Sequence, residues 1–187
     1  GYLWTSNGLN WDRKQHPVLL RMMKGYRVRR PSDFRPRFPW TFWHLKKAWI
    51  YLNLNTFSGN LSAAILSIGY FFGGRVNEYA AYGTKCWNKI IHVNDLQFIK
   101  NGSVLKSLII DFKHHKTNKE GIYCGKVEAV CSCDLGICPV HIIDRYLRLR
   151  KRIWGDNWNN YPLLLTNKGK PVRCQHVNNL ISCLLYT

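Results

Sequence analysis

Acidic residues are scarce in this chain, and their scarcity limits the functions that the protein can have. The sequence holds 10 Asp and Glu against 28 Lys and Arg, a formal net charge of +18 over 187 residues. This excess exceeds what solubility requires and is typical of proteins that bind a polyanion. Nucleic acid is therefore the first partner that we expect.

Long apolar runs are also missing. No stretch reaches the roughly 18 residues that a membrane-spanning helix needs, so we expect no membrane partner. The hydrophobic share of 46% and the eight Trp instead predict a packed globular core, which a disordered basic tail would not have. The length suits one domain, or one domain with a piece of another.

Cysteine is present in an odd number, seven, and the first residues show no signal-peptide pattern. Together these features predict a reducing, intracellular compartment. Cys131, Cys133, Cys138 and His141 offer donor atoms that zinc uses, but the Cys-x-Cys opening differs from common zinc knuckles. We favour ordinary buried or loop thiols here, expect no metal and no cofactor, and keep a zinc-stabilised interaction domain as the alternative.

An arginine at a glycine corner is the most informative feature of the sequence. The apolar run at residues 63–72 predicts a buried helix, and Gly73 and Gly74 end it. Arg75 follows directly, and Glu78 lies at the i+3 spacing that lets a carboxylate fix a guanidinium. Such a cation is either a simple helix cap or a placed phosphate ligand.

The remaining pattern predicts helices mixed with a small antiparallel sheet, an α+β fold. Thr41 is a plausible N-cap for one helix, and Ser58 or Asn60 for the next. Strands are expected at residues 95–99, 104–112 and 121–130, and the last two form a hairpin whose polar tip carries Lys116. Further helices are expected from Pro139 and at about residues 174–185.

Before residue 41 the chain is basic and rich in proline. Residues 16–25 predict a short helix, and residues 27–39 an extended linker suited to phosphate contact or to simple solvation. The linker arginines are Arg27, Arg29, Arg30, Arg35 and Arg37.

Four stretches in order resemble the tyrosine recombinase (phage integrase) family, most closely the recombinases of retrotransposons and related mobile elements. They are residues 72–82 (FGGRVNEYAAY), 109–118 (IIDFKHHKTN), 138–150 (CPVHIIDRYLRLR) and 162–171 (PLLLTNKGKP). Residues 16–30 also resemble that family's junction between core-binding and catalytic domains. The resemblance divides the chain into the end of a core-binding domain with its linker (1–40) and a catalytic domain (41–187).

The resemblance implies an integrase-like core that breaks and rejoins double-stranded DNA through a 3′-phosphotyrosyl intermediate, in DNA integration and recombination. Arg75 matches the first phosphate-binding arginine, Lys116 the general acid, and Glu78 a supporting acid. The linker arginines, His115 and Lys119 are expected to contact DNA. No metal, cofactor or small-molecule substrate is implied. Other recombinase protomers are expected partners, in the nucleus of a eukaryote or otherwise in the cytoplasm.

The chain departs from the family pattern near its end. A His-x-x-Arg motif, a further His or Trp and the nucleophilic Tyr are expected there, but His176 is followed at the third position by Asn179. Tyr186 is too close to this stretch to be the nucleophile. We therefore expect a C-terminally truncated recombinase that is inactive alone. The alternative is a non-catalytic, basic nucleic-acid-binding remnant of a mobile element.

Overall fold

The computed structural model describes residues 41–83, 87–112, 125–155 and 161–185, all of them within the compact unit that spans residues 40–187. The helix predicted at residues 16–25 and the basic linker lie outside these ranges. Along the described chain the helices are α3 (Phe42–Ile50), α4 (Phe57–Phe71), α5 (Val76–Tyr79), α6 (Pro139–Trp154) and α7 (Cys174–Leu185). Short 3₁₀ turns are η2 (Trp87–Lys89), η3 (Val93–Asp95) and η4 (Cys133–Leu135), and the strands are β1 (Leu96–Asn101), β2 (Val104–Asp111) and β3 (Lys126–Val130).

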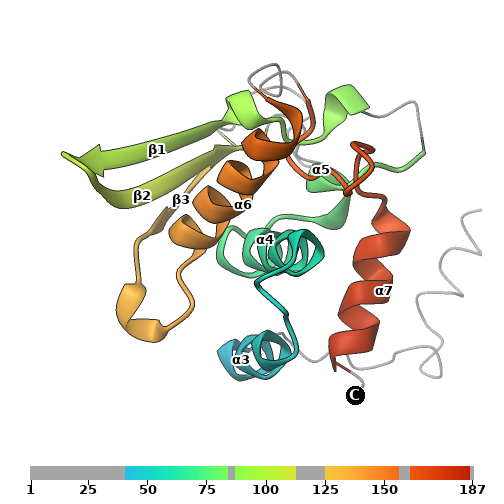
Figure 1. The fold of residues 1–187 in the computed structure, drawn as a ribbon, viewed down its shortest axis with the longest axis horizontal. Helices are drawn as coiled ribbons and strands as arrows, with labels where there is room; N and C mark the ends of the chain where they lie inside the picture. Colours follow the sequence, from blue (N-terminus) through green and yellow to red (C-terminus); the bar gives the residue numbers. More distant parts are fainter. Residues whose placement is uncertain (1–40, 84–86, 113–124, 156–160, 186–187) are drawn as a thin grey trace, which may run out of the picture. The chain divides into compact units, whose positions relative to one another are not determined.

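This mixture of helices with one three-stranded antiparallel sheet confirms the predicted α+β class (Figure 1). The strand order is β1-β2-β3, so both connections join neighbours, and the predicted hairpin between β2 and β3 is present as an antiparallel pair. None of the described helices has the length and apolar character that crossing a bilayer demands.

Helix α4 forms the centre of the packing. Every residue from Gly59 to Ile68 is buried, and the helix carries no charged side chain. A helix that is apolar on all sides must be covered on all sides. Figure 1 shows it nearly end-on among α6, α3 and α7.

The start of α4 differs from the prediction. Its N-cap is Thr56, whose hydroxyl accepts a hydrogen bond from the Gly59 backbone N–H at 3.0 Å. Asn60 is inside the helix and buried, and its amide donates to the carbonyls of Leu54 and Thr56. Ser58 and Asn60 were therefore wrong choices, because a threonine two residues before Ser58 already caps the helix.

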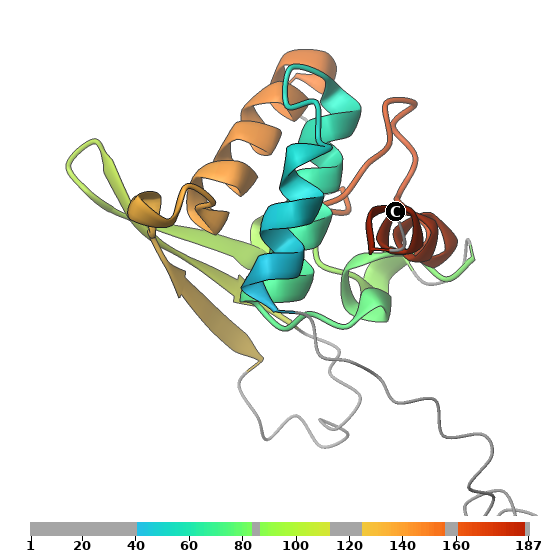
Figure 2. The ribbon, with the colours of Figure 1, turned by 90° about the horizontal axis from the view of Figure 1, so that it is seen from below.

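Helix α6 lies beside α4 and also contacts β2 (Figure 2). Pro139 opens it, as predicted, and Val140 and Ile143 are buried while Arg148 and Arg152 are exposed. The ring of Phe57, at the start of α4, packs against Tyr146 at 5.7 Å between centroids. Helix α6 therefore turns an apolar face to the core and leaves arginines on its outer face.

A fully buried arginine on α6 was not predicted. Arg150 has 0% exposure, and its Nη1 donates to the Pro162 carbonyl at 2.6 Å and to the Leu163 carbonyl. Desolvation by burial lowers the pKa of its guanidinium below the ordinary value. One turn earlier, the Tyr146 hydroxyl donates to the Leu165 carbonyl at 3.2 Å and accepts from its N–H at 2.9 Å. Helix α6 therefore fixes residues 162–165 to the core through their backbone.

Replacing Arg150 with methionine will lower the free energy of unfolding by about 2–4 kcal/mol, because two buried carbonyl oxygens lose their donor. Arg152→Met removes the same guanidinium from an exposed site of the same helix. We expect this change to alter the free energy of unfolding by less than about 0.5 kcal/mol. Urea denaturation measures both variants. Equal effects would show that Arg150 contributes no more than a surface arginine does.

Candidate functional site

The corner that presents Arg75 has the geometry that the sequence predicted. Helix α4 is followed by Gly73 in the left-handed region, at φ +60°, and the Gly74 N–H donates to the Ile68 carbonyl at 3.2 Å. Arg75 then forms the N-cap of the short helix α5. The chain reverses within a few residues and leaves the arginine at the start of a new helix.

Glu78 acts on the backbone of this corner. Its Oε2 accepts a hydrogen bond from the Arg75 backbone N–H at 2.8 Å, and the carboxylate is buried, with 6% exposure. The sequence suggested that Glu78 binds the Arg75 guanidinium, whereas this hydrogen bond goes to the Arg75 backbone. The Arg75 side chain is exposed, and no described residue accepts a hydrogen bond from its guanidinium.

Backbone hydrogen bonds tie α5 to a distant part of the chain. The Glu78 carbonyl accepts from Ile91 N–H at 2.8 Å, and the Ile91 carbonyl accepts from Leu163 N–H at 2.8 Å. On the other side Ala81 N–H donates to the Val172 carbonyl at 2.7 Å, and the Ala81 carbonyl accepts from Cys174, at the start of α7. The corner is therefore held from both sides.

The base of the β2–β3 hairpin also reaches this corner. A Cβ built on Gly74 would lie 3.2 Å from Cε1 of Phe112, the residue that follows β2. Phe112 N–H donates to the Gly125 carbonyl at 3.0 Å, which closes the described part of the hairpin. The structure thus brings the end of β2 next to the residue that precedes Arg75.

Several predicted site residues lie outside the described ranges. These are Lys116, His115 and Lys119 on the hairpin tip, and Arg27, Arg29, Arg30, Arg35 and Arg37 in the linker. Lys116 is four residues beyond Phe112 in the sequence, outside the described part of the hairpin.

Tyr79 is the first tyrosine after Arg75, and it does not suit nucleophilic attack. It is 2% exposed, and burial, with Cys174 and Glu78 nearby, raises the pKa of its hydroxyl to about 12. It lines an apolar cavity of about 340 Å³ together with residues of α4 and Ile181 of α7. Neither Lys nor Arg is among the residues that line this mainly apolar cavity, so it is poorly suited to a phosphate.

Several of the few acidic residues form hydrogen bonds or an ion pair within the protein. Glu78 is buried at the corner, and buried Asp95 accepts from the His92 backbone N–H at 2.9 Å. Asp144 pairs with Arg148 on α6 at 2.8 Å. Internal use of these carboxylates leaves fewer of them to oppose the basic surface, which favours an anionic partner.

No family model and no curated protein matches this chain.

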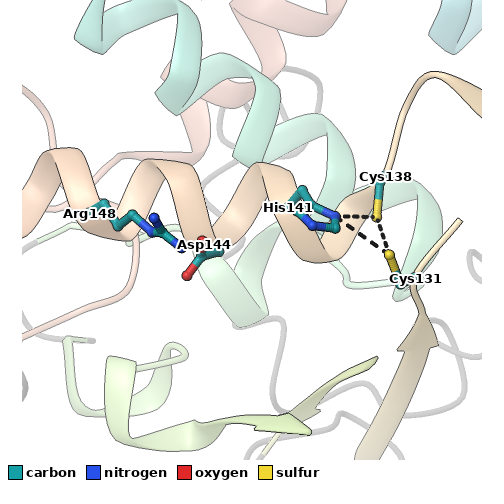
Figure 3. A network of polar contacts seen from close by, with 5 residues as sticks. All are labelled: Cys131, Cys138, His141, Asp144 and Arg148. Carbon is teal, nitrogen blue, oxygen red and sulfur yellow. Dashed lines mark hydrogen bonds and ion pairs between the residues drawn. The ribbon is translucent and has the colours of Figure 1, made fainter. Parts of the chain in front are cut away.

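A second cluster lies at the opposite end of α6 from Arg150, where Cys131, Cys133, Cys138 and His141 converge. Their ligand atoms all lie within 4.8 Å of one another. Figure 3 shows three of these residues, Cys131, Cys138 and His141. The sequence interpretation favoured ordinary thiols, since the Cys-x-Cys spacing is unusual. What the spacing could not show is that the end of β3, turn η4 and the first turn of α6 meet at one point.

Hydrogen bonding perturbs the thiols of this cluster. A hydrogen bond with Cys133 raises the pKa of Cys131 to about 12, and burial and a hydrogen bond with Cys138 contribute less. Burial disfavours the Cys138 thiolate, but hydrogen bonds from His141 and Ser132 outweigh it and lower the pKa of Cys138 to about 7. The cluster therefore already contains one thiol that ionises readily near neutral pH.

Gly74→Ala tests the contact between the corner and the hairpin. The added Cβ would lie 3.1–3.2 Å from atoms of Ile68, Phe112 and Tyr79, so those neighbours must move. We expect a loss of about 1–3 kcal/mol in unfolding free energy. Gly69→Ala, near the end of α4, is the control, because its nearest such contact is an ordinary 3.4 Å from the Tyr79 hydroxyl. Urea denaturation of both variants provides the check, and identical unfolding free energies would contradict the tight fit at Gly74.

Proposed function

We propose that this chain belongs to the catalytic domain of a tyrosine recombinase, where it binds double-stranded DNA and holds the phosphate at which strands are exchanged. The observation that carries the proposal is the contact of Phe112 with Gly74. Through it, the hairpin that bears Lys116 starts beside the corner that presents Arg75. The proposal places Lys116, four residues beyond Phe112, in the same region as Arg75, because phosphate chemistry requires both cations there.

The residue types fit the chemistry of phosphoryl transfer. A guanidinium stays charged at any working pH, and its planar fork can hold two nonbridging oxygens and stabilise charge that develops on them. Arg75 has the exposure for this role, and Glu78 fixes its backbone. An ammonium can protonate the leaving 5′ oxygen as a general acid, which is the role proposed for Lys116.

The excess of basic residues supplies the general attraction to DNA. Phosphate contacts dominate affinity and fix the position of a protein on the duplex without reading bases. The linker arginines, His115 and Lys119 belong to this group in the proposal. Further protomers bound to the same DNA, and a nuclear location in a eukaryote, follow from the same family resemblance.

Cleavage needs groups that these 187 residues do not provide. No His-x-x-Arg occurs anywhere in the sequence, and Tyr79 is buried with a raised pKa. Without the His-x-x-Arg motif and the Tyr that the family places after it, the residues present can clamp a phosphate but are not expected to form the covalent intermediate. We therefore expect this chain by itself to bind DNA without cutting it.

Arg75→Ala will reduce the affinity for a DNA duplex and lower the slope of log K against log salt by about one unit, the effect of one lost phosphate contact. Lys100→Ala removes the same charge at a matched exposed site. Lys100 pairs with Leu105, seven residues from Phe112 along β2, so it lies roughly 23 Å from the hairpin base. The measurement is fluorescence anisotropy at several salt concentrations. If both variants weaken binding equally, the corner has no special part in it.

The enzymatic part of the proposal is tested by reading the coding DNA beyond the codon for Thr187. A His-x-x-Arg followed some tens of residues later by Tyr is expected there. In the extended protein, Arg75→Lys should then abolish formation of the covalent protein–DNA adduct while leaving most of the binding, because lysine lacks the fork. Open reading sequence without that pattern would leave the alternative of a basic DNA-binding remnant.

A further inference from the structure

Three separate elements deliver the four donor atoms of the sulfur and imidazole cluster. Cys131 follows the last residue of β3, Cys133 opens turn η4, and Cys138 is the N-cap of α6. His141 lies three residues after Cys138 and therefore on the same face of the helix. The turn closes through Gly136 at φ +73°, whose N–H donates to the Cys133 carbonyl at 3.1 Å.

The distances within the cluster are close to those of a tetrahedral site. Sγ of Cys131 lies 3.1 Å from Sγ of Cys133, and 3.5 Å from Sγ of Cys138. Nδ1 of His141 lies 3.5, 3.5 and 3.2 Å from the sulfurs of Cys131, Cys133 and Cys138. Around tetrahedral zinc, two sulfurs lie about 3.8 Å apart and a sulfur and a nitrogen about 3.6 Å. Side-chain movements of up to about 1 Å would therefore admit the ion, since the Cys131 and Cys133 sulfurs must separate by about 0.7 Å and no two donor atoms lie more than 4.8 Å apart.

We propose that Cys131, Cys133, Cys138 and His141 bind one zinc ion as a structural Cys₃His site. Three thiolates and one imidazole are the donors that zinc prefers, and a set of four protein ligands is closed, leaving no position for a substrate. The site therefore holds the fold together and takes no part in the chemistry proposed for Arg75.

The surroundings of the cluster suit bound thiolates. The Ser132 backbone N–H donates to the Cys138 sulfur at 3.4 Å, the kind of outer contact that steadies a metal-bound thiolate. Cys133 and His141 are exposed, so an ion can enter from solvent, while Cys138 is buried against the core. The narrow Cys-x-Cys spacing works because the strand ends at Val130 and the 3₁₀ turn begins at Cys133.

A disulfide explains the cluster less well. All of the cluster cysteines are free, and joining two of the three would leave one thiol and His141 without a role. A zinc ion uses all four groups at once. It also joins the end of the edge strand β3 to the start of α6, which packs on α4 and β2.

The first measurement is the metal content of the full chain, purified under reducing conditions and analysed by plasma mass spectrometry. We expect about one zinc per chain. Cobalt substituted for zinc should give the intense visible bands of a tetrahedral site together with thiolate-to-cobalt charge transfer. A protein with no bound zinc that also fails to take up added zinc or cobalt would overturn the proposal.

Variants at the exposed ligands test the assignment with little risk to folding. Cys133→Ser and His141→Ala should each lose stoichiometric zinc during gel filtration. Cys183→Ser, which removes an exposed thiol on α7 outside the cluster, should retain it. Full zinc retention by both ligand variants would overturn the site. So would a Cys131–Cys133 disulfide in protein prepared with reductant, which would make the parent chain two mass units lighter than the reduced chain.

Removing the ion should destabilise the protein. A metal chelator is expected to lower the melting temperature of the parent chain and of Cys183→Ser by about 5–10 °C. It should have little effect on His141→Ala, which has already lost the ion. This measurement does not involve DNA, so it stands or fails separately from the recombinase proposal. An unchanged melting temperature after complete removal of zinc would refute a structural role.

Discussion

The rest of the structure depends on the burial of α4 over the ten residues from Gly59 to Ile68. Its residues from Gly59 to Ile68 are shielded on every side, which requires α6, α3 and α7 to pack around one apolar helix. The same helix ends at a pair of glycines, so its position also determines where the chain turns. A rigid, buried helix is a firm support for a charged side chain just beyond its end.

Helix α6 connects the two places in this fold where chemistry is concentrated. Its first turn carries Cys138 and His141 of the proposed metal site, and its last turns carry Tyr146 and Arg150. Those two residues hold residues 162–165, whose backbone in turn binds Ile91, which binds Glu78. An unbroken series of hydrogen bonds thus runs from the C-terminal half of α6 to the corner of Arg75.

The burial of some charged side chains decides which charges remain on the surface of this protein. Glu78 and Asp95 serve backbone N–H groups at the starts of short helices, so their negative charges stabilise local turns. Arg150, although cationic, is removed from the surface and serves two carbonyls. The basic residues that remain exposed are the ones available to a polyanion.

The sequence by itself determined the α+β class, the antiparallel hairpin, the start of α6, the bounds of α7, and the glycine corner before Arg75. Periodicity, proline at a helix start and paired glycines act locally, so they can be read without the tertiary structure. The choice of Thr56 as a cap and the Glu78 bond to a backbone N–H were missed, because several neighbouring residues could fill each role.

Only the tertiary structure decided which distant residues meet. Three contacts follow from packing between separate elements: Phe112 lies against Gly74, Arg150 is buried against residues 162–163, and Cys131 and Cys133 come within 3.5 Å of His141. Spacing along a sequence carries no such information when a strand, a turn and a helix supply the ligands. Burial of α4 fixes where those elements lie, and their positions bring the donor atoms together.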